Sequence, residues 1–201
     1  MHAYSRQGSL PAITHCSLLL LVVLGSSLKA ATVQRFTLEE LTDNAEGIFV
    51  SLCREAVTIR LEGQLYIGYR FAIIETLKGE EREELELHLP GGRYEGFQTR
   101  IPGMPTFVPG ERAVLFLTAE NHLGQAWPVG LGQGKFRIER PPTAKQARVY
   151  QELDGLSFYP STAAKKIVDQ SLQGLPLDQF LNRIRILLPP RTKSALSIDV
   201  R

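Results

Sequence analysis

The chain has 201 residues, of which 43% are hydrophobic, and its 23 basic and 21 acidic side chains give a formal net charge of +2 at pH 7. This length and composition suffice for one domain with a core of its own. The balanced, interspersed charges argue against nucleic acid and anionic lipid as partners, because both normally require a clustered basic face.

The first 30 residues have the pattern of a secretory signal peptide. Arg6 precedes an apolar run over residues 18–24 that is too short to span a bilayer, and small residues follow up to Ala30. We expect cleavage after Ala30 and a secreted or periplasmic location. The alternative is an uncleaved leader, which would be the expected route to membrane contact. Loss of Arg6 and Lys29 would leave 21 basic residues against 21 acidic ones, and thus a neutral chain.

Cysteine usage predicts that the fold depends on its core. The expected mature chain contains one cysteine, Cys53, so an internal disulfide cannot form. Cys53 lies in the apolar stretch of residues 48–61, a position typical of a small buried side chain rather than a reactive thiol.

A short helix is predicted at the start of the mature domain. Thr37 and Glu40 have the spacing of a capping box, and Leu38, Leu41 and Ala45 follow at helical intervals. We expect this helix to end near residue 47.

From residue 48 to residue 140 the hydrophobic period changes to two, which predicts at least five strands. Alternation over residues 65–73 gives the longest apolar face. Leu85, Leu87 and Leu89 then alternate with polar residues, His88 among them, until Pro90 and two glycines end the strand.

The next segment, residues 93–111, is rich in proline and glycine and predicts a loop with a short edge strand near residues 97–101. Residues 113–117 are all apolar, as expected for a strand covered on both faces. A turn over residues 121–124 predicts a hairpin. Three glycines between residues 130 and 134 then predict bulges or sharp bends before alternation resumes at Phe136.

The C-terminal third contains one clear element, an amphipathic helix from Leu177 to Leu187 between Pro176 and Pro189, which we expect to pack on its own domain. A strand over residues 146–151 and a helix or irregular segment over 161–172 are weaker predictions. The expected organisation is a signal peptide (1–30), a β-barrel domain (31–140), a C-terminal extension with a packed helix (141–190) and a loose tail (191–201).

No motif assigns a catalytic, cofactor or metal site. The glycines before Lys135 resemble a phosphate-binding loop, but their spacing is wrong and Phe136 replaces the hydroxyl residue. His88 and His122, the two histidines outside the leader, are not spaced as a metal-ligand pair. We therefore assign no catalytic residue, no metal ligand and no cofactor, although a site assembled only by folding stays open.

Aromatic and arginine residues in or beside loops are the candidates for partner contact. Tyrosine, tryptophan and arginine dominate binding hot spots, whereas loop aromatics can also close the end of a barrel. We expect the candidates to share one accessible patch. They are Arg93, Tyr94, Phe97, Arg100, Phe107 and Trp127.

The order of several motifs is itself informative. They are Phe71-x-x-x-Glu75-x-Leu77-Lys78-Gly79, Pro90-Gly91-Gly92, Pro102-Gly103-x-Pro105-x-Phe107-x-x-Gly110-Glu111, Leu115-Phe116-Leu117 and Gly130-x-x-Gln133-Gly134-Lys135-Phe136. Together they resemble an uncharacterised bacterial family of small secreted β-barrel proteins, over residues 48–140 and the final helix. This resemblance implies no known activity.

The strand pattern also resembles the OB-type barrel of netrin-like and metalloprotease-inhibitor domains, but their N-terminal cysteine and disulfides are missing here, so their inhibitory residues are not carried over. We expect a mainly β fold, a small, partly open antiparallel β-barrel with a helix at each end, with a β-sandwich as the alternative. The expected function is an exported, non-enzymatic module that binds a protein or peptide. The alternative is an extracytoplasmic hydrolase.

Overall fold

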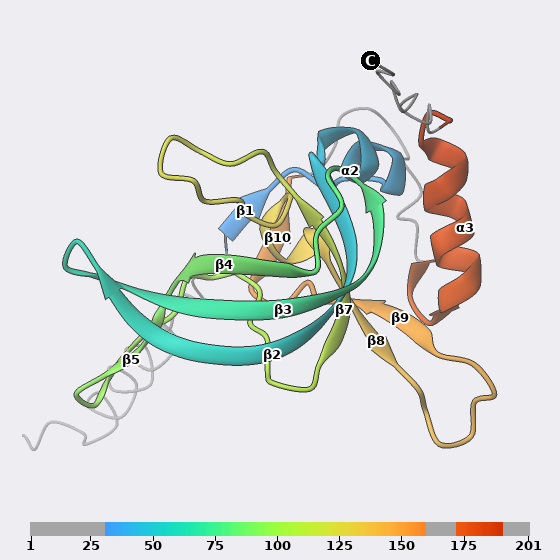
Figure 1. Ribbon diagram of the computed structural model, residues 1–201. Coiled ribbons are helices and arrows are strands. Elements are labelled where there is room, and N and C mark those ends of the chain that lie inside the picture. The colour runs from blue at the N-terminus through green and yellow to red at the C-terminus, as the bar shows by residue number, and fades with distance from the viewer. Residues whose placement is uncertain (1–30, 160–171, 191–201) are drawn as a thin grey trace, which may run out of the picture.

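A computed structural model describes residues 31–159 and 172–190 of the chain (Figure 1). The expectation of a mainly β, antiparallel fold with two helices is confirmed. The principal sheet has seven strands in the order β11-β9-β8-β7-β2-β3-β4. Their bounds are β2 Gly47–Leu61, β3 Gln64–Lys78, β4 Glu84–Pro90, β7 Arg112–Leu117, β8 Lys135–Glu139, β9 Arg148–Gln151 and β11 Leu175–Pro176.

Within the described residues two small sheets accompany the principal one. β1 (Ala31–Val33) pairs in parallel with β10 (Leu156–Phe158), and β5 (Gly92–Tyr94) pairs antiparallel with β6 (Phe97–Thr99). The edge strand predicted near Phe97 and the strand predicted before Gln151 are therefore both present.

The principal sheet is strongly curved but is not found as a closed barrel. Within the described residues its edge strands, β4 and β11, are not paired with each other. The curvature is clearest in the fifteen-residue strands β2 and β3 (Figure 1), whose pairing shifts register at three places between Ile48 and Glu55. Such irregularities bend a strand and increase its twist.

Both predicted helices form where local signals place them. α2 (Leu38–Asn44) begins with the capping box: the Glu40 N–H donates to Thr37 Oγ1 over 3.2 Å, and the Thr37 N–H donates to Glu40 Oε2 over 2.8 Å. α3 (Leu177–Leu187) has the predicted bounds. Neither helix has the length and the apolar run that crossing a membrane requires.

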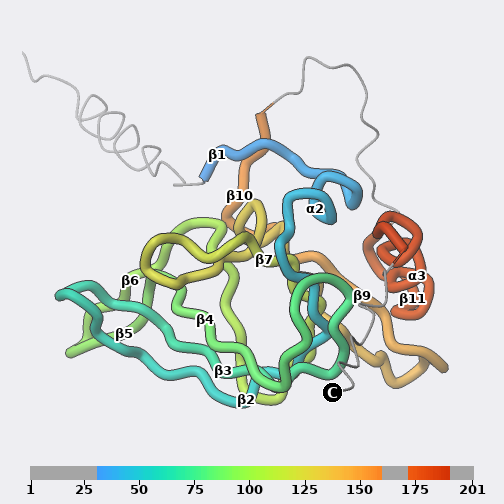
Figure 2. The backbone as a smooth tube through the Cα atoms, turned by 45° about the horizontal axis from the view of Figure 1, so that its top comes forward, coloured from blue at the N-terminus to red at the C-terminus, as the bar shows by residue number. Residues whose placement is uncertain are grey.

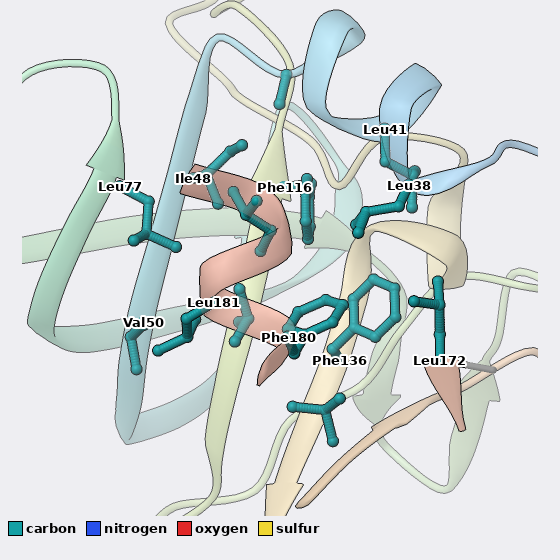
Figure 3. Close-up of a cluster of buried hydrophobic side chains, with 14 of the residues drawn as sticks. Leu38, Leu41, Ile48, Val50, Leu77, Phe116, Phe136, Leu172, Phe180 and Leu181 are labelled. Atoms are coloured by element: carbon teal, nitrogen blue, oxygen red, sulfur yellow. The ribbon is translucent and has the colours of Figure 1, made fainter. Parts of the chain in front are cut away.

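The helices cover one face of the sheet and form the first core cluster with it (Figure 3). Phe180 of α3 packs on the face of the neighbouring strands β7 and β8, with its ring centroid 4.6 Å from that of Phe136 and 6.4 Å from that of Phe116. Leu181 and Ile184 are buried beside it. The amphipathic helix thus packs on its own domain, as expected.

A second core cluster fills the opposite, concave face of the sheet. It contains Phe49, Cys53, Tyr69, Phe71, Leu85, Leu87, Leu89, Met104, Phe107, Ala113, Leu115 and Leu117. Strand β7 serves both clusters, because Val114 and Phe116 point into the first while its alternate residues point into the second. This explains why the run is apolar at every position.

The glycine-rich segment before β8 does bend, but as a 3-10 turn, η1 (Leu131–Gly134), rather than as a bulged strand. Gly134 leaves no room for a side chain, because an added Cβ would lie 2.6 Å from the backbone nitrogen of Val129. Tight backbone contact, and not strand pairing, therefore sets the chain direction here. The predictions for residues 1–30, 161–171 and 191–201 fall outside the described residues.

Candidate binding site

The β5–β6 hairpin lies beside the tip of the longer β2–β3 hairpin (Figure 2). Its two-residue turn, Glu95-Gly96, has positive φ values of 47° and 83°, which suits the right-handed twist of a short hairpin. Tyr94 pairs directly with Phe97 in this hairpin. Their side chains therefore share one face.

Two glycines make this placement possible. Gly91 and Gly92 have φ values of 137° and 127°, a region that side chains disfavour, and they turn the chain out of β4. The Gly91 N–H donates to Leu65 O over 3.0 Å. A Cβ at position 92 would lie 2.8 Å from Thr58 Cγ2, so β5 rests closely on β2. The hairpin is thus attached to the end of the main sheet.

The hairpin presents large side chains to solvent. Phe97 is 79% exposed, Tyr94 44% and Ile101 37%, and Arg93 and Arg100 are also exposed. The side chain of Arg93 donates to Gln98 Oε1 over 3.3 Å. A phenylalanine exposed to this degree contributes little to the core.

A surface pocket of about 360 Å³ lies between the two hairpins, and we call it the hairpin pocket. Its lining includes Arg60, Gln64, Leu65, Tyr66, Tyr94 and Ile101. The guanidinium carbon of Arg60 lies 5.7 Å from the centroid of the Tyr94 ring, within the range of a cation–π contact.

A second pocket of about 300 Å³, which we call the sheet pocket, lies over strands β2, β3 and β4. Its arginine, Arg70, lies 3.2 Å from Glu55 and 3.5 Å from Glu86. Both carboxylates line the same pocket, together with His88 and Ile59. The charge of this arginine is therefore balanced within the chain.

Phe107, one of the predicted contact residues, belongs to the core. It is 4% exposed and meets Tyr69 and Phe71 edge-on, with 5.0 Å between ring centroids in both pairs. Residues 102–111 fold back over the concave face of the sheet and carry this ring inside. The expectation that all six candidates share one accessible patch is therefore wrong.

Trp127 is half-buried against the same core cluster. The Thr118 N–H donates to Trp127 O over 2.8 Å, and the Trp127 N–H donates to Thr118 Oγ1 over 3.1 Å. Its indole Nε1 is buried and has no hydrogen-bond partner among the described residues. The hairpin thus brings Arg93, Tyr94 and Phe97 together, with Arg100 just after β6, and leaves Phe107 and Trp127 elsewhere.

The main polar feature that sequence reasoning missed is a buried cluster around Lys135, whose side chain is fully buried. Lys135 Nζ lies 2.5 Å from Thr106 O, 2.6 Å from Glu111 Oε1 and 3.1 Å from Glu152 Oε2. It also lies 4.4 Å from the centroid of the Phe107 ring. The cluster ties β8 to the segments that flank β7 and β10.

This cluster does not offer an obvious reactive group. Lys135 Nζ donates to Thr106 O and Glu152 Oε2 and forms an ion pair with Glu111 Oε1, which accepts no hydrogen bond within the described residues. Burial and then the negative charge of Glu111 raise the pKa of the nearby Cys53 thiol, which is 1% exposed. Burial likewise raises the pKa of Tyr69 to about 12. The prediction of a buried Cys53 is confirmed.

A signal for Lys135 did exist in the sequence. Residues 113–117 are all apolar, so the strand that they form is expected to be covered on both faces. The strands beside it in the sheet are then expected to be covered as well. Alternation places Lys135 opposite Phe136 and therefore on the concave side.

Metal binding has no visible basis in the described parts of the chain, where no three His, Cys, Asp or Glu side chains are grouped closely enough to hold an ion. No protein-family model, curated protein or solved structure matches the sequence or the fold.

Proposed function

We propose that the chain is an exported, non-enzymatic module that binds a protein or peptide through the β5–β6 hairpin and the hairpin pocket. The observation that carries the proposal is the exposure of Phe97, 79%, at the end of a hairpin where it pairs with Tyr94. Burial of one such side chain in a complex contributes roughly 1.5–3 kcal/mol.

The composition of the surface supports the same proposal. Aromatic and arginine side chains supply most of the binding energy at protein interfaces, and Tyr94, Phe97 and Arg60 lie together here. The pocket beside them is of the size that holds small ligands or single side chains of a partner. A partner segment can therefore place an anchor residue in the pocket and cover Phe97 with its neighbours.

The proposed export rests on the leader pattern of residues 1–30. In the expected mature chain Ala31 would be the first residue, and its backbone nitrogen donates to Gly155 O over 3.0 Å. Intact-mass analysis of the protein outside the cytoplasm should show a new N-terminus near Ala31. A full-length chain in the cytoplasm would contradict export.

An OB-like architecture is part of this proposal. Its support is the long, curved β2–β3 hairpin and the open sheet around a filled concave face (Figure 1). Barrels of this class commonly bind through loops and strand faces at one side. The site proposed here, at the tip of two hairpins, fits such a use.

Site-specific photo-crosslinking tests the binding surface. A photoreactive amino acid at position 97, placed in the chain expressed in its native host, should give a discrete protein or peptide adduct. The matched control is position 186, because Ile186 is 83% exposed on α3, at the opposite end of the molecule from the hairpin (Figure 1). Equal adducts at both positions, or none at position 97, would count against the proposed surface.

A further inference from the structure

We infer that the hairpin pocket recognises a carboxylate, so that the bound segment presents an aspartate or glutamate side chain next to an apolar residue. This inference rests on the proposed binding function and specifies the chemistry of the partner. It follows from the positive charge of Arg60 and from the absence of acidic residues among the described residues that line the pocket.

The first observation is that Arg60 has no ionic partner. Among the described residues it forms no ion pair and no hydrogen bond, and its one recorded interaction is with the Tyr94 ring. Stacking on a ring leaves the N–H groups at the edge of a guanidinium available. Arg60 is therefore a cation whose donors are unused.

The second observation is the absence of acid in the lining. No aspartate or glutamate is among the described residues that line the hairpin pocket, whereas Glu55 and Glu86 line the sheet pocket and bracket Arg70 there. The two pockets are similar in volume and each contains one arginine. Their difference is that only the sheet pocket supplies its own counter-ions.

The third observation concerns the neutral groups around Arg60. Tyr94 and Thr99 line the pocket from one face of the β5–β6 hairpin, and their side chains form no hydrogen bond within the described residues. Amide and hydroxyl groups can donate to the two oxygens of a carboxylate while arginine donates to the same group. The pocket thus has the hydroxyl groups of Tyr94 and Thr99 beside one positive charge.

The apolar side chains at the rim of the pocket are the reason to expect an apolar residue next to the carboxylate. Leu65 and Ile101 line it, and Phe97 lies on the same face of its hairpin as Tyr94. A segment whose carboxylate reaches Arg60 must pass over these apolar side chains. A phosphate-bearing partner is less well matched, because phosphate recognition normally uses a cluster of arginines rather than one.

The test is a selection of random peptides displayed on phage against the immobilised full chain, followed by measurement of the dissociation constants of the enriched peptides. Aspartate or glutamate should be enriched at one position beside an apolar residue. In those peptides, replacing the acid by its amide should weaken binding by about 10- to 100-fold, the range expected for a charge-assisted hydrogen bond.

Matched variants of the protein assign the effect to the pocket. Arg60→Gln should weaken binding of the selected peptides by about 10- to 100-fold. Arg70→Gln removes the same charge from the sheet pocket and should change binding by less than about twofold. Both positions are exposed, and circular dichroism of each variant should match that of the parent chain.

The outcomes separate this inference from the proposed function. Two results would overturn the carboxylate inference and leave the binding surface in place. One is that peptides lose binding to Phe97→Ala but show no preference for an acidic residue. The other is that such peptides bind Arg60→Gln as tightly as the parent chain. If no enriched peptide depends on Phe97, the proposed function fails as well. Acid preference that depends on Arg60 and not on Arg70 supports both.

Discussion

Lys135 and Arg60 are two cations of the same sheet in opposite circumstances. Lys135 is fully buried and has three oxygens within 3.1 Å of its Nζ, whereas Arg60 is exposed and has no ionic partner among the described residues. A buried charge requires complete compensation, while an exposed one does not. The Lys135 cluster thus links distant segments of the fold, whereas Arg60 stays unpaired within the described residues, as the proposed contact with a partner requires.

The aromatic residues follow the same division. Phe107 and Phe97 come from one loop-rich stretch, yet Phe107 is 4% exposed and contacts Lys135, while Phe97 is 79% exposed beside the pocket of Arg60. This contrast between the Lys135 cluster and the hairpin pocket should appear as differences in stability between variants of the two regions.

The largest effect is expected for Lys135→Met. It leaves Glu111, whose side chain is 10% exposed, without its cation and should lower the free energy of unfolding by roughly 3–5 kcal/mol. Urea denaturation measures the loss. The double variant Lys135→Met/Glu111→Leu should recover much of it, because Glu152 is more exposed and also lies 3.4 Å from Arg137. A loss below about 1 kcal/mol in the single variant would contradict the importance of the cluster.

The second prediction compares two truncations of the same residue type. Phe107→Ala empties a site between Tyr69 and Phe71 and should cost roughly 3–5 kcal/mol of folding free energy. Phe97→Ala should change it by less than about 0.5 kcal/mol, as is usual for surface positions. Thermal and urea unfolding measure both. Similar losses of unfolding free energy in the two variants would contradict the assignment of Phe107 to the core and of Phe97 to the surface.

The third prediction concerns alkaline pH. The pKa of Tyr69 is about 12 in the folded chain and about 10 when the side chain is exposed, so below pH 10 both states are protonated and no difference arises. Between pH 10 and 12 the unfolded state ionises first, and stability should fall by roughly 2–3 kcal/mol relative to Tyr69→Phe. Unfolding curves of both proteins from pH 9 to 12 measure this. If the difference in unfolding free energy between the parent and Tyr69→Phe stays constant across that range, the fold does not protect Tyr69 from ionisation.

The smallest effects are expected at the two pocket arginines. Arg60→Gln should leave the free energy of unfolding within about 0.5 kcal/mol of the parent, and Arg70→Gln should lower it by no more than about 1 kcal/mol, because exposed ion pairs contribute little. Added salt should reduce the effect of Arg70→Gln further. A clear loss of stability in Arg60→Gln would mean that this arginine has a structural partner after all.

Local features were predictable from the sequence. The capping box of α2, the bounds of α3 and the doubly covered strand β7 all depend on residues within one element, where spacing and composition carry the information. The short strand near Phe97 was found for the same reason, whereas its partner β5 and the turn between them were not predicted.

The candidate site was only partly predictable. Tyr94 and Phe97 were expected to be accessible, and both are exposed, but Arg60 comes from a strand more than thirty residues earlier and nothing in its local pattern links it to them. Phe107 was misplaced because its burial depends on which face residues 102–111 cover. Lys135 was missed because its partners, Thr106, Glu111 and Glu152, are brought together by pairing between distant strands.

The central claim is that the hairpin pocket binds a partner and does not support the fold. The most direct measurement takes the Arg60→Gln/Phe97→Ala double variant and determines, on one preparation, its urea unfolding midpoint and its affinity for the partner crosslinked at position 97. We predict an unchanged midpoint and an affinity at least about 30-fold weaker, the loss expected for a single hot-spot residue. Unchanged affinity, or a midpoint lowered as in Lys135→Met, would contradict the claim.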